Sequence, residues 1–388
     1  MPRDLRSSRW TRLSLPLALA LLPAVATAQV FPGLTLPPSG GNQKSAVSQW
    51  IGPVEVRIEY SSPDVHAPNG DDRRGKIWGE LVPHGLTDPG FGTCKACPWR
   101  AGANENTVLT VSHDVEIEGQ KLPAGRYGLH FITGPEEWTL VLSKNSTSWG
   151  SFFYDPAEDA LRAAVKPRKA PYREWLSYDF VDRDADRTTV ELQWEELAVP
   201  IRIVVPAIDE VYYQALAREM RNATGFAWQA RTNAVQYLLG RGIHLDTALA
   251  WAQEAATPSF TGTENFTTFS VLAQAQEANG QADAAKATMA KAIAHPTAGA
   301  LEIHAYGRQL LTQNRAAEAL AVFELNAKRN PDAWFVDFGM ARGLSALGRY
   351  KEALAYAKKA LPKAPDEVNK ASVTAAIAKL EKGEDMNR

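Results

Sequence analysis

The sequence lacks most of the features that place a protein in a chemical class. Its 388 residues include only two cysteines, and its formal net charge is −2. Such a chain has no excess of basic residues to form the face that nucleic acid or an acidic membrane requires. It also contains no nucleophile elbow, no phosphate-cradling glycine loop and no paired-carboxylate signature. We therefore expect no nucleic-acid partner, and no reaction follows from a motif.

Long apolar runs are missing as well. The run 13–22 follows four arginines and is too short to span a bilayer. It fits a secretory signal peptide over residues 1–28, with a cleavage site at Ala26-Thr27-Ala28. We expect an exported chain, periplasmic or extracellular, whose mature form has no transmembrane segment.

Strand signals dominate the first half of the remaining chain. After a Pro/Gly-rich lead-in over 29–44, Val54, Val56 and Ile58 alternate with charged residues, as in a strand with one wet face. Many short strands without a helical pattern between them predict an antiparallel β-sandwich over 45–206. We expect its further strands at 76–82, 107–112, 115–118, 126–133, 138–143, 160–166, 176–181, 188–194 and 199–205.

In residues 207–388 the apolar period changes from two to about 3.6. Gly280, Asn314 and Gly348 each separate two helical runs, and they lie 34 residues apart. A period near 34 with paired helices resembles tetratricopeptide repeats. We expect an all-α solenoid of about four repeats, the first two degenerate, with a capping helix over 370–380.

Stacked helix pairs form a concave face that suits a peptide or protein segment. Tyr306 and Arg308, on the first helix of a repeat, are candidate groove residues. We expect a protein or peptide partner there. The alternative is that the array braces the β domain or mediates self-association.

The segment Trp99–Thr107 combines several reactive side chains at the start of an expected strand. Arg100, Asn104 and Glu105 are its catalytic candidates: Glu105 as a general base and Arg100 as a holder of an anionic substrate. Trp99 and Trp149 are candidate stacking platforms for a ligand. The alternative is that Arg100 and Glu105 form an ion pair that braces the loop.

Cys94 and Cys97 lie in an irregular insert between expected strands. In an oxidising compartment a close pair tends to form a disulfide, which is the reading we favour. A redox motif would need a helix after the pair, and Pro98 argues against one. Zinc is the third alternative, with His113 and His130 as further ligands. We expect no other cofactor.

An ordered series of motifs resembles the family called domain of unknown function 2911. The matching segments are Tyr60-Ser61-Ser62-Pro63, Gly75-Lys76-Ile77-Trp78-Gly79, Leu81-Val82-Pro83, Trp99-Arg100-Ala101-Gly102-Ala103-Asn104-Glu105, Leu122-Pro123-Ala124-Gly125-Arg126-Tyr127-Gly128-Leu129 and Trp149-Gly150. The resemblance covers roughly residues 45 to 205 and implies an exported bacterial β-rich domain with no assigned activity. The insert that carries Cys94 and Cys97 departs from the usual pattern of the family.

Together these features favour a non-catalytic exported scaffold, in which the repeats recruit a protein and the β domain recognises a second ligand. The alternative is a hydrolase-like or metal-binding enzyme with a site around Arg100, Asn104 and Glu105 and a nearby histidine.

Overall fold

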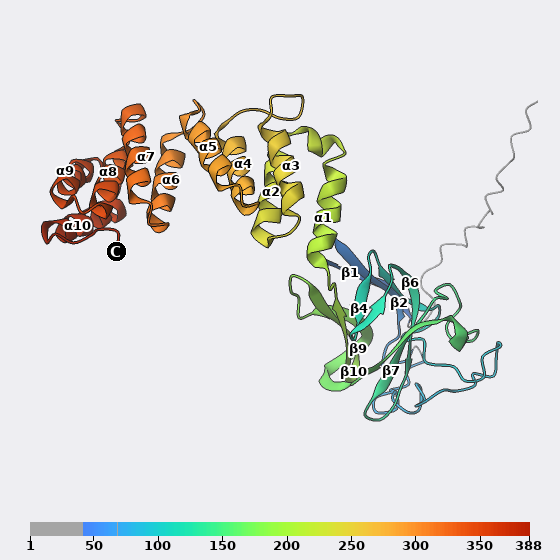
Figure 1. Ribbon diagram of the computed structural model, residues 1–388. Coiled ribbons are helices and arrows are strands. Elements are labelled where there is room, and N and C mark those ends of the chain that lie inside the picture. The colour runs from blue at the N-terminus through green and yellow to red at the C-terminus, as the bar shows by residue number, and fades with distance from the viewer. Residues whose placement is uncertain (1–41, 68) are drawn as a thin grey trace, which may run out of the picture.

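The computed structural model describes residues 42–67 and 69–388. Within this part of the chain, strands β1 to β10 precede helices α1 to α10, and the helices lead away from the β domain (Figure 1). The expected signal peptide, 1–28, and nearly all of the lead-in, 29–44, lie outside the described residues.

Two antiparallel sheets form the β domain. The larger has the order β1-β2-β3-β6-β7-β8 and the smaller the order β5-β4-β10-β9. The strands are β1 Gln43–Ile51, β2 Val54–Ser62, β3 Thr107–Val111, β4 Val115–Ile117, β5 Gln120–Leu122, β6 Gly125–Ile132, β7 Trp138–Ser143, β8 Asp159–Val165, β9 Arg168–Val181 and β10 Arg187–Val204.

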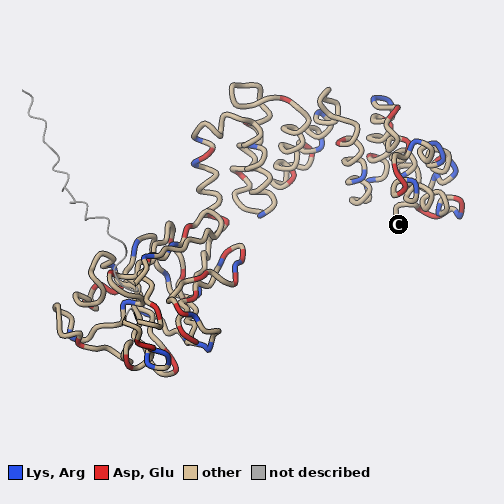
Figure 2. The backbone as a smooth tube through the Cα atoms, turned by 180° about the vertical axis from the view of Figure 1, so that it is seen from behind, with Lys and Arg blue, Asp and Glu red and all other residues tan. Residues whose placement is uncertain are grey.

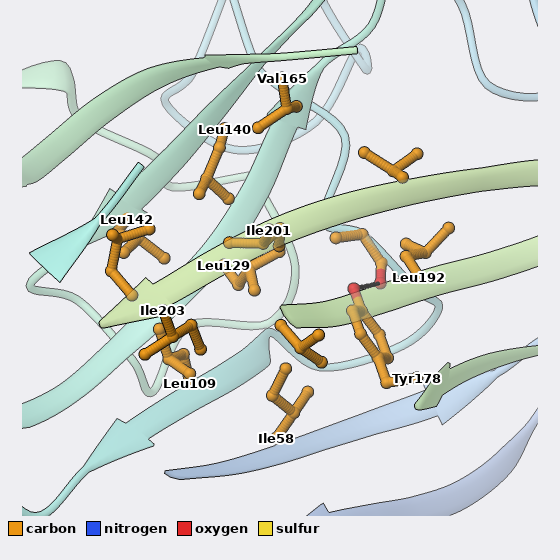
Figure 3. Packing of buried hydrophobic residues seen from close by; sticks show 14 of the residues in the cluster. Ile58, Leu109, Leu129, Leu140, Leu142, Val165, Tyr178, Leu192, Ile201 and Ile203 are labelled. Carbon is orange, nitrogen blue, oxygen red and sulfur yellow. Dashed lines mark hydrogen bonds between the residues drawn. The ribbon is translucent and has the colours of Figure 1, made fainter. Parts of the chain in front are cut away.

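One continuous hydrophobic core lies between the two sheets. Leu109, Leu129 and Leu140 of the larger sheet meet Leu192 and Ile201 of the smaller sheet, as Figure 3 shows. Apolar side chains on alternate strand positions face inward, so each sheet buries one side. This arrangement confirms the expected antiparallel β-sandwich.

Three expectations about individual strands are wrong. Residues 76–82 form only an isolated bridge between Trp78 and Val82, in a stretch of turns. The strands expected at 188–194 and 199–205 form one strand, β10. A bulge at Glu195 allows β10 to stay paired with β9 across the polar residues between the two expected strands. Strand β1, which pairs with β2 along its whole length, begins at Gln43 inside the expected lead-in.

The helical half consists of a linking helix, four antiparallel helix pairs and a final helix in the described chain. These helices are α1 Ile208–Glu219, α2 Trp228–Arg241, α3 Leu245–Ala256, α4 Phe266–Ala278, α5 Ala282–Ala294, α6 Ala300–Thr312, α7 Ala316–Arg329, α8 Trp334–Ala346, α9 Tyr350–Ala360 and α10 Glu367–Glu381. The expected solenoid is therefore confirmed.

Each helix pair turns on a residue with left-handed backbone. Gly242, Gly280, Asn314 and Gly348 have φ between 58° and 74°. Glycine and asparagine tolerate this conformation after a helix, where other residues are strained. The repeat spacing in the sequence is thus the spacing of these turns.

Close helix packing in the array depends on small residues. Phe323 of α7 is buried against Gly307 of α6 and Gly339 and Gly343 of α8. An added Cβ on Gly307 would lie 2.4 Å from the ring. The ring therefore fills the space that the three glycines leave between two repeats.

Helix α1 connects the two halves. Its Ile208 and Val211 pack against the core of the sandwich, and Tyr212 lies against Gly52 in the turn between β1 and β2. Tyr212 also contacts Tyr237 of α2, with ring centroids 5.1 Å apart.

Across the described chain, no helix combines the length and apolarity needed to cross a membrane. Acidic and basic residues are spread over both halves (Figure 2).

Candidate functional sites

Trp99 belongs to an aromatic cluster in the sandwich rather than to an open platform. Its ring lies 5.7 Å from that of Trp78 and 6.2 Å from that of Trp138. It also stacks on Trp194 at 6.4 Å. The half-buried Trp99 anchors the start of the loop, whereas Trp149 is 53% exposed.

The loop after Trp99 holds two non-glycine residues in left-handed backbone. Ala101 has φ 52° and is fully buried, and Asn104 has φ 57°. Such conformations are unfavourable and persist where surrounding contacts impose them, often at functional sites. Here Arg100 Nη1 donates to the carbonyl of Asn104 at 2.7 Å, and Thr107 Oγ1 donates to that of Ala101 at 3.0 Å.

Arg100 and Glu105 do not form the ion pair offered as an alternative. Within the described chain, the Arg100 guanidinium has no carboxylate within 4 Å. It lies over the ring of Phe152 at 4.8 Å and directly beneath Gly150. Burial lowers the pKa of this arginine. Arg100 thus supports the loop 145–152 from within.

His130 lies behind the same loop. It is 2% exposed, and its Nδ1 lies 3.0 Å from Ser151 Oγ. Burial, and secondly the charge of Arg100, lower its pKa to about 4, so the ring is neutral at pH 7. His113 does not lie near His130. Strands β3 and β6 pair Val111 with Gly125 at one end and Thr107 with Leu129 at the other. His113 follows the Val111 end, whereas His130 is next to Leu129 at the opposite end.

Glu105 lines a small pocket of about 180 Å³ on the outside of the loop. Its carboxylate accepts a hydrogen bond from Ser61 Oγ at 3.1 Å and lies 4.0 Å from Lys44 Nζ. Asn104 points to Asn42 instead, with 3.2 Å between the side chains. The three catalytic candidates, Arg100, Asn104 and Glu105, therefore face different surroundings.

Cys94 and Cys97 are joined as a disulfide within the insert. The pair packs against Val141 and Tyr154, and the Cys94 amide donates to the carbonyl of Phe152 at 3.0 Å. The insert thereby holds the far side of the loop 145–152. Among the described residues, no three His, Cys, Asp or Glu side chains are grouped as metal ligands.

A second candidate site is a groove of about 420 Å³ in the helical array, where the α4–α5 pair meets α6. Ala273, Ala285, Met289 and Tyr306 supply its apolar surface. Gln274, Gln309 and Gln313 line it with side-chain amides. Tyr306, one of the two candidate groove residues, thus lines this groove, and its role in binding stays a prediction.

The basic side chains that line this groove are paired with a carboxylate, whereas two of its acidic side chains are not paired. Lys286 and Arg315 both bind the carboxylate of Glu318, each at 2.9 Å. Glu277 and Asp283 also line the groove, are exposed, and have no cation within 4 Å in the described chain. The groove consequently offers two unpaired carboxylates beside an apolar surface.

Arg308 is not part of this groove. It is exposed on another face of α6. Burial, then the charge of Arg342 and then that of Arg308 lower the pKa of His304 to about 4. Tyr306 and Arg308 are two positions apart, and such positions point to different sides of a helix.

The sequence does not mark the joint between α5 and α6 as different from the others. Helices α3 and α4 pack directly, as do α7 and α8. At the joint between α5 and α6, an apolar cluster that includes Ile293 and Ile303 is joined by polar contacts from α7. Arg329 Nη1 donates to the Ile293 carbonyl at 2.6 Å, and Asn326 Nδ2 donates to that of Ala300 at 2.8 Å.

The fold defines a protein of two parts, a β-sandwich and an array of helix pairs. Residues 42–203, which form the β domain, match the family described as "Protein of unknown function (DUF2911)". The resemblance seen in the sequence motifs is thereby confirmed.

A comparison with curated proteins finds no match. Among solved structures, the chain is similar to "Crystal structure of MamA protein" at 18% identity, over 39% of this chain and 79% of that chain, with a TM-score of 0.29. It is similar to "Crystal structure of YrrB: a TPR protein with an unusual peptide-binding site" at 14% identity, over 44% and 86%, with a TM-score of 0.30.

Proposed function

We propose that the protein is an exported, non-catalytic scaffold whose helical array binds an extended, basic segment of another protein. The observation that carries the proposal is the groove beside Tyr306. It combines apolar surface, amide side chains and two unpaired carboxylates, which together suit a polypeptide. The proposal requires no cofactor.

The groove chemistry selects the class of segment. Glutamine side chains both donate and accept, so Gln274, Gln309 and Gln313 suit the amides and carbonyls of an extended backbone. Met289 and Tyr306 offer a place for an apolar side chain. Glu277 and Asp283 favour a lysine or arginine next to it, because opposite charges steer and orient a partner.

Export is supported by the expected signal peptide and by the disulfide-bonded Cys94 and Cys97, since such pairs persist in oxidising compartments. In that setting the β domain recognises a second ligand, and helix α1 joins it to the array that binds the protein segment. No substrate or reaction enters the proposal, because Arg100, Asn104 and Glu105 face different surroundings.

The test is selection from a library of random short peptides on the purified full chain, followed by titration of the selected peptides. We expect them to carry lysine or arginine next to an apolar residue. The double variant Glu277→Lys/Asp283→Lys should weaken their binding at least about tenfold. The matched control, Glu324→Lys/Asp332→Lys, reverses two exposed charges outside the groove and should bind normally.

Failure to select any peptide would contradict the proposal. Equal loss of affinity in both double variants would also contradict it, because the effect would then come from net charge and not from the groove.

A further inference from the structure

The pocket beside Glu105 is a second site, and nothing in the peptide-binding proposal uses it. It lies between the ends of β1 and β2, the loop after Trp99 and the loop 145–152. Most of its lining residues carry a hydrogen-bonding side chain, among them Lys44, Glu59, Ser61, Glu105, Asn106 and Arg126.

The charges of this pocket balance. Lys44 lies 4.0 Å from Glu105, and Arg126 lies 3.2 Å from Glu59. With two cations and two anions, the pocket has no net charge and does not favour an ion of either sign. The hydroxyls of Ser61, Ser146 and Thr147 add groups that both donate and accept. The lining therefore suits an uncharged ligand with many hydroxyl groups.

Asn106 lines the pocket with a side chain that is only partly paired. It is only 6% exposed, and its Nδ2 donates to the carbonyl of Asn145 at 3.2 Å. Its Oδ1 is buried and has no partner in the described chain. A buried acceptor without a donor costs free energy, and a ligand hydroxyl would satisfy it.

The loops on both sides of the pocket are held in place. Arg100 fixes the left-handed turn at Asn104 and supports Gly150, and the Asn106 amide donates to the Ser148 carbonyl at 3.2 Å. Trp149, the residue after pocket-lining Ser148, is 53% exposed. An exposed indole in the loop that lines the pocket is available to offer an apolar face to a ligand that is otherwise polar.

We propose that this pocket binds a neutral carbohydrate. The carboxylates of Glu105 and Glu59 accept from sugar hydroxyls, and Lys44 and Arg126 donate to sugar oxygens. Asn106 Oδ1 takes a further hydroxyl. Trp149 covers the C–H face of the sugar ring. A second role for the chain follows: the sandwich attaches to a glycan while the array holds a protein segment.

The test is saturation-transfer NMR of the full chain with a panel of neutral mono- and oligosaccharides, including glucose, galactose and N-acetylglucosamine series. Any sugar that binds is then titrated. We expect Glu105→Ala and Trp149→Ala each to reduce affinity at least about tenfold, which is about 1.4 kcal/mol.

Matched controls separate the pocket from the general surface. Trp50→Ala removes a tryptophan that is 56% exposed at the far end of β1, and Glu136→Ala removes an exposed acid in the turn before β7. Both should leave affinity within about twofold. No binding by any sugar in the panel, or binding that survives both pocket substitutions, would overturn the proposal. Neither result bears on peptide binding at the helical groove.

Discussion

The two halves of the chain are stable for different reasons. The sandwich has one core that includes residues from nearly every strand, with Trp138 and Trp194 among its largest fully buried side chains. The helical array has several smaller cores made mainly of alanine, leucine and single aromatic rings. A single core ties all of its strands into one cooperative unit, whereas stacked repeats depend on their nearest neighbours.

This difference explains where the candidate sites lie. The sandwich can hold one loop in strained backbone at two residues, Ala101 and Asn104, because a large core supports this loop. The array has its groove at the joint between the α4–α5 pair and α6, beside the small apolar cluster that includes Met289 and Ile303. A rigid unit thus carries a preformed pocket, and a modular one carries a groove.

The largest expected effect comes from truncating one large side chain in each half. Trp138 is 1% exposed, and its Nε1 donates to the Gly134 carbonyl at 2.8 Å. Trp138→Ala and Phe323→Ala should each cost about 3–5 kcal/mol of folding free energy. By calorimetry, Trp138→Ala should lower the transition of the entire sandwich. Phe323→Ala should affect α6 to α8 and leave the sandwich transition in place.

The comparison would fail if Phe323→Ala lowered the sandwich transition as much as Trp138→Ala does. The two halves would then share one cooperative unit, through α1.

Acid should weaken the sandwich through His130. Its folded pKa of about 4 lies below the ordinary value of 6.5, so between these pH values the unfolded chain binds a proton that the folded chain does not. Its contribution is therefore complete above pH 6.5 and falls by about 3 kcal/mol as the pH decreases to 4. Urea unfolding between pH 7 and pH 4, followed by tryptophan fluorescence, measures this slope.

His130→Gln keeps a polar side chain that can bond Ser151 but does not titrate. It should flatten the slope in the sandwich, while His304→Gln, at the other buried histidine, should not. An unchanged slope in His130→Gln would assign the acid sensitivity to other groups.

The smallest effects separate two helical glycines of the array. An added Cβ at Gly240 of α2 meets nothing within 4 Å, whereas at Gly307 it meets the buried ring of Phe323. Gly240→Ala should therefore stabilise by about 0.5–1 kcal/mol, because alanine favours the helix. Gly307→Ala should destabilise by about 1–3 kcal/mol through overpacking. Chemical unfolding followed by circular dichroism measures both, and equal signs would contradict the role given to Gly307.

Periodicity in the sequence was sufficient to predict both fold classes. Alternation at Val54, Val56 and Ile58 predicted β2, and the spacing of Gly280, Asn314 and Gly348 predicted the helix pairs. Local patterns failed at 76–82, where an apolar stretch rich in turns packs on the core without pairing as a strand. They also failed at Glu195, because a bulge is set by the partner strand.

The sites were less predictable, because they depend on which loops meet in space. The sequence identified the loop that contains Arg100 and Glu105, but only the structure shows that Arg100 points inward and Glu105 outward. Asn106, the unpartnered acceptor of the pocket, carries no sequence signal. Tyr306 was expected to line a groove, whereas the residues of α5 that line the same groove were not.

Hydrogen exchange of the full chain, read by mass spectrometry, tests the contrast between the two halves most directly. We predict that β2, β3, β6, β7 and β10 exchange together, at one rate set by the opening of the whole sandwich. Protection in the array should instead vary from one helix pair to the next and fall at the joint between α5 and α6. A single common rate for strands and helices would contradict the account.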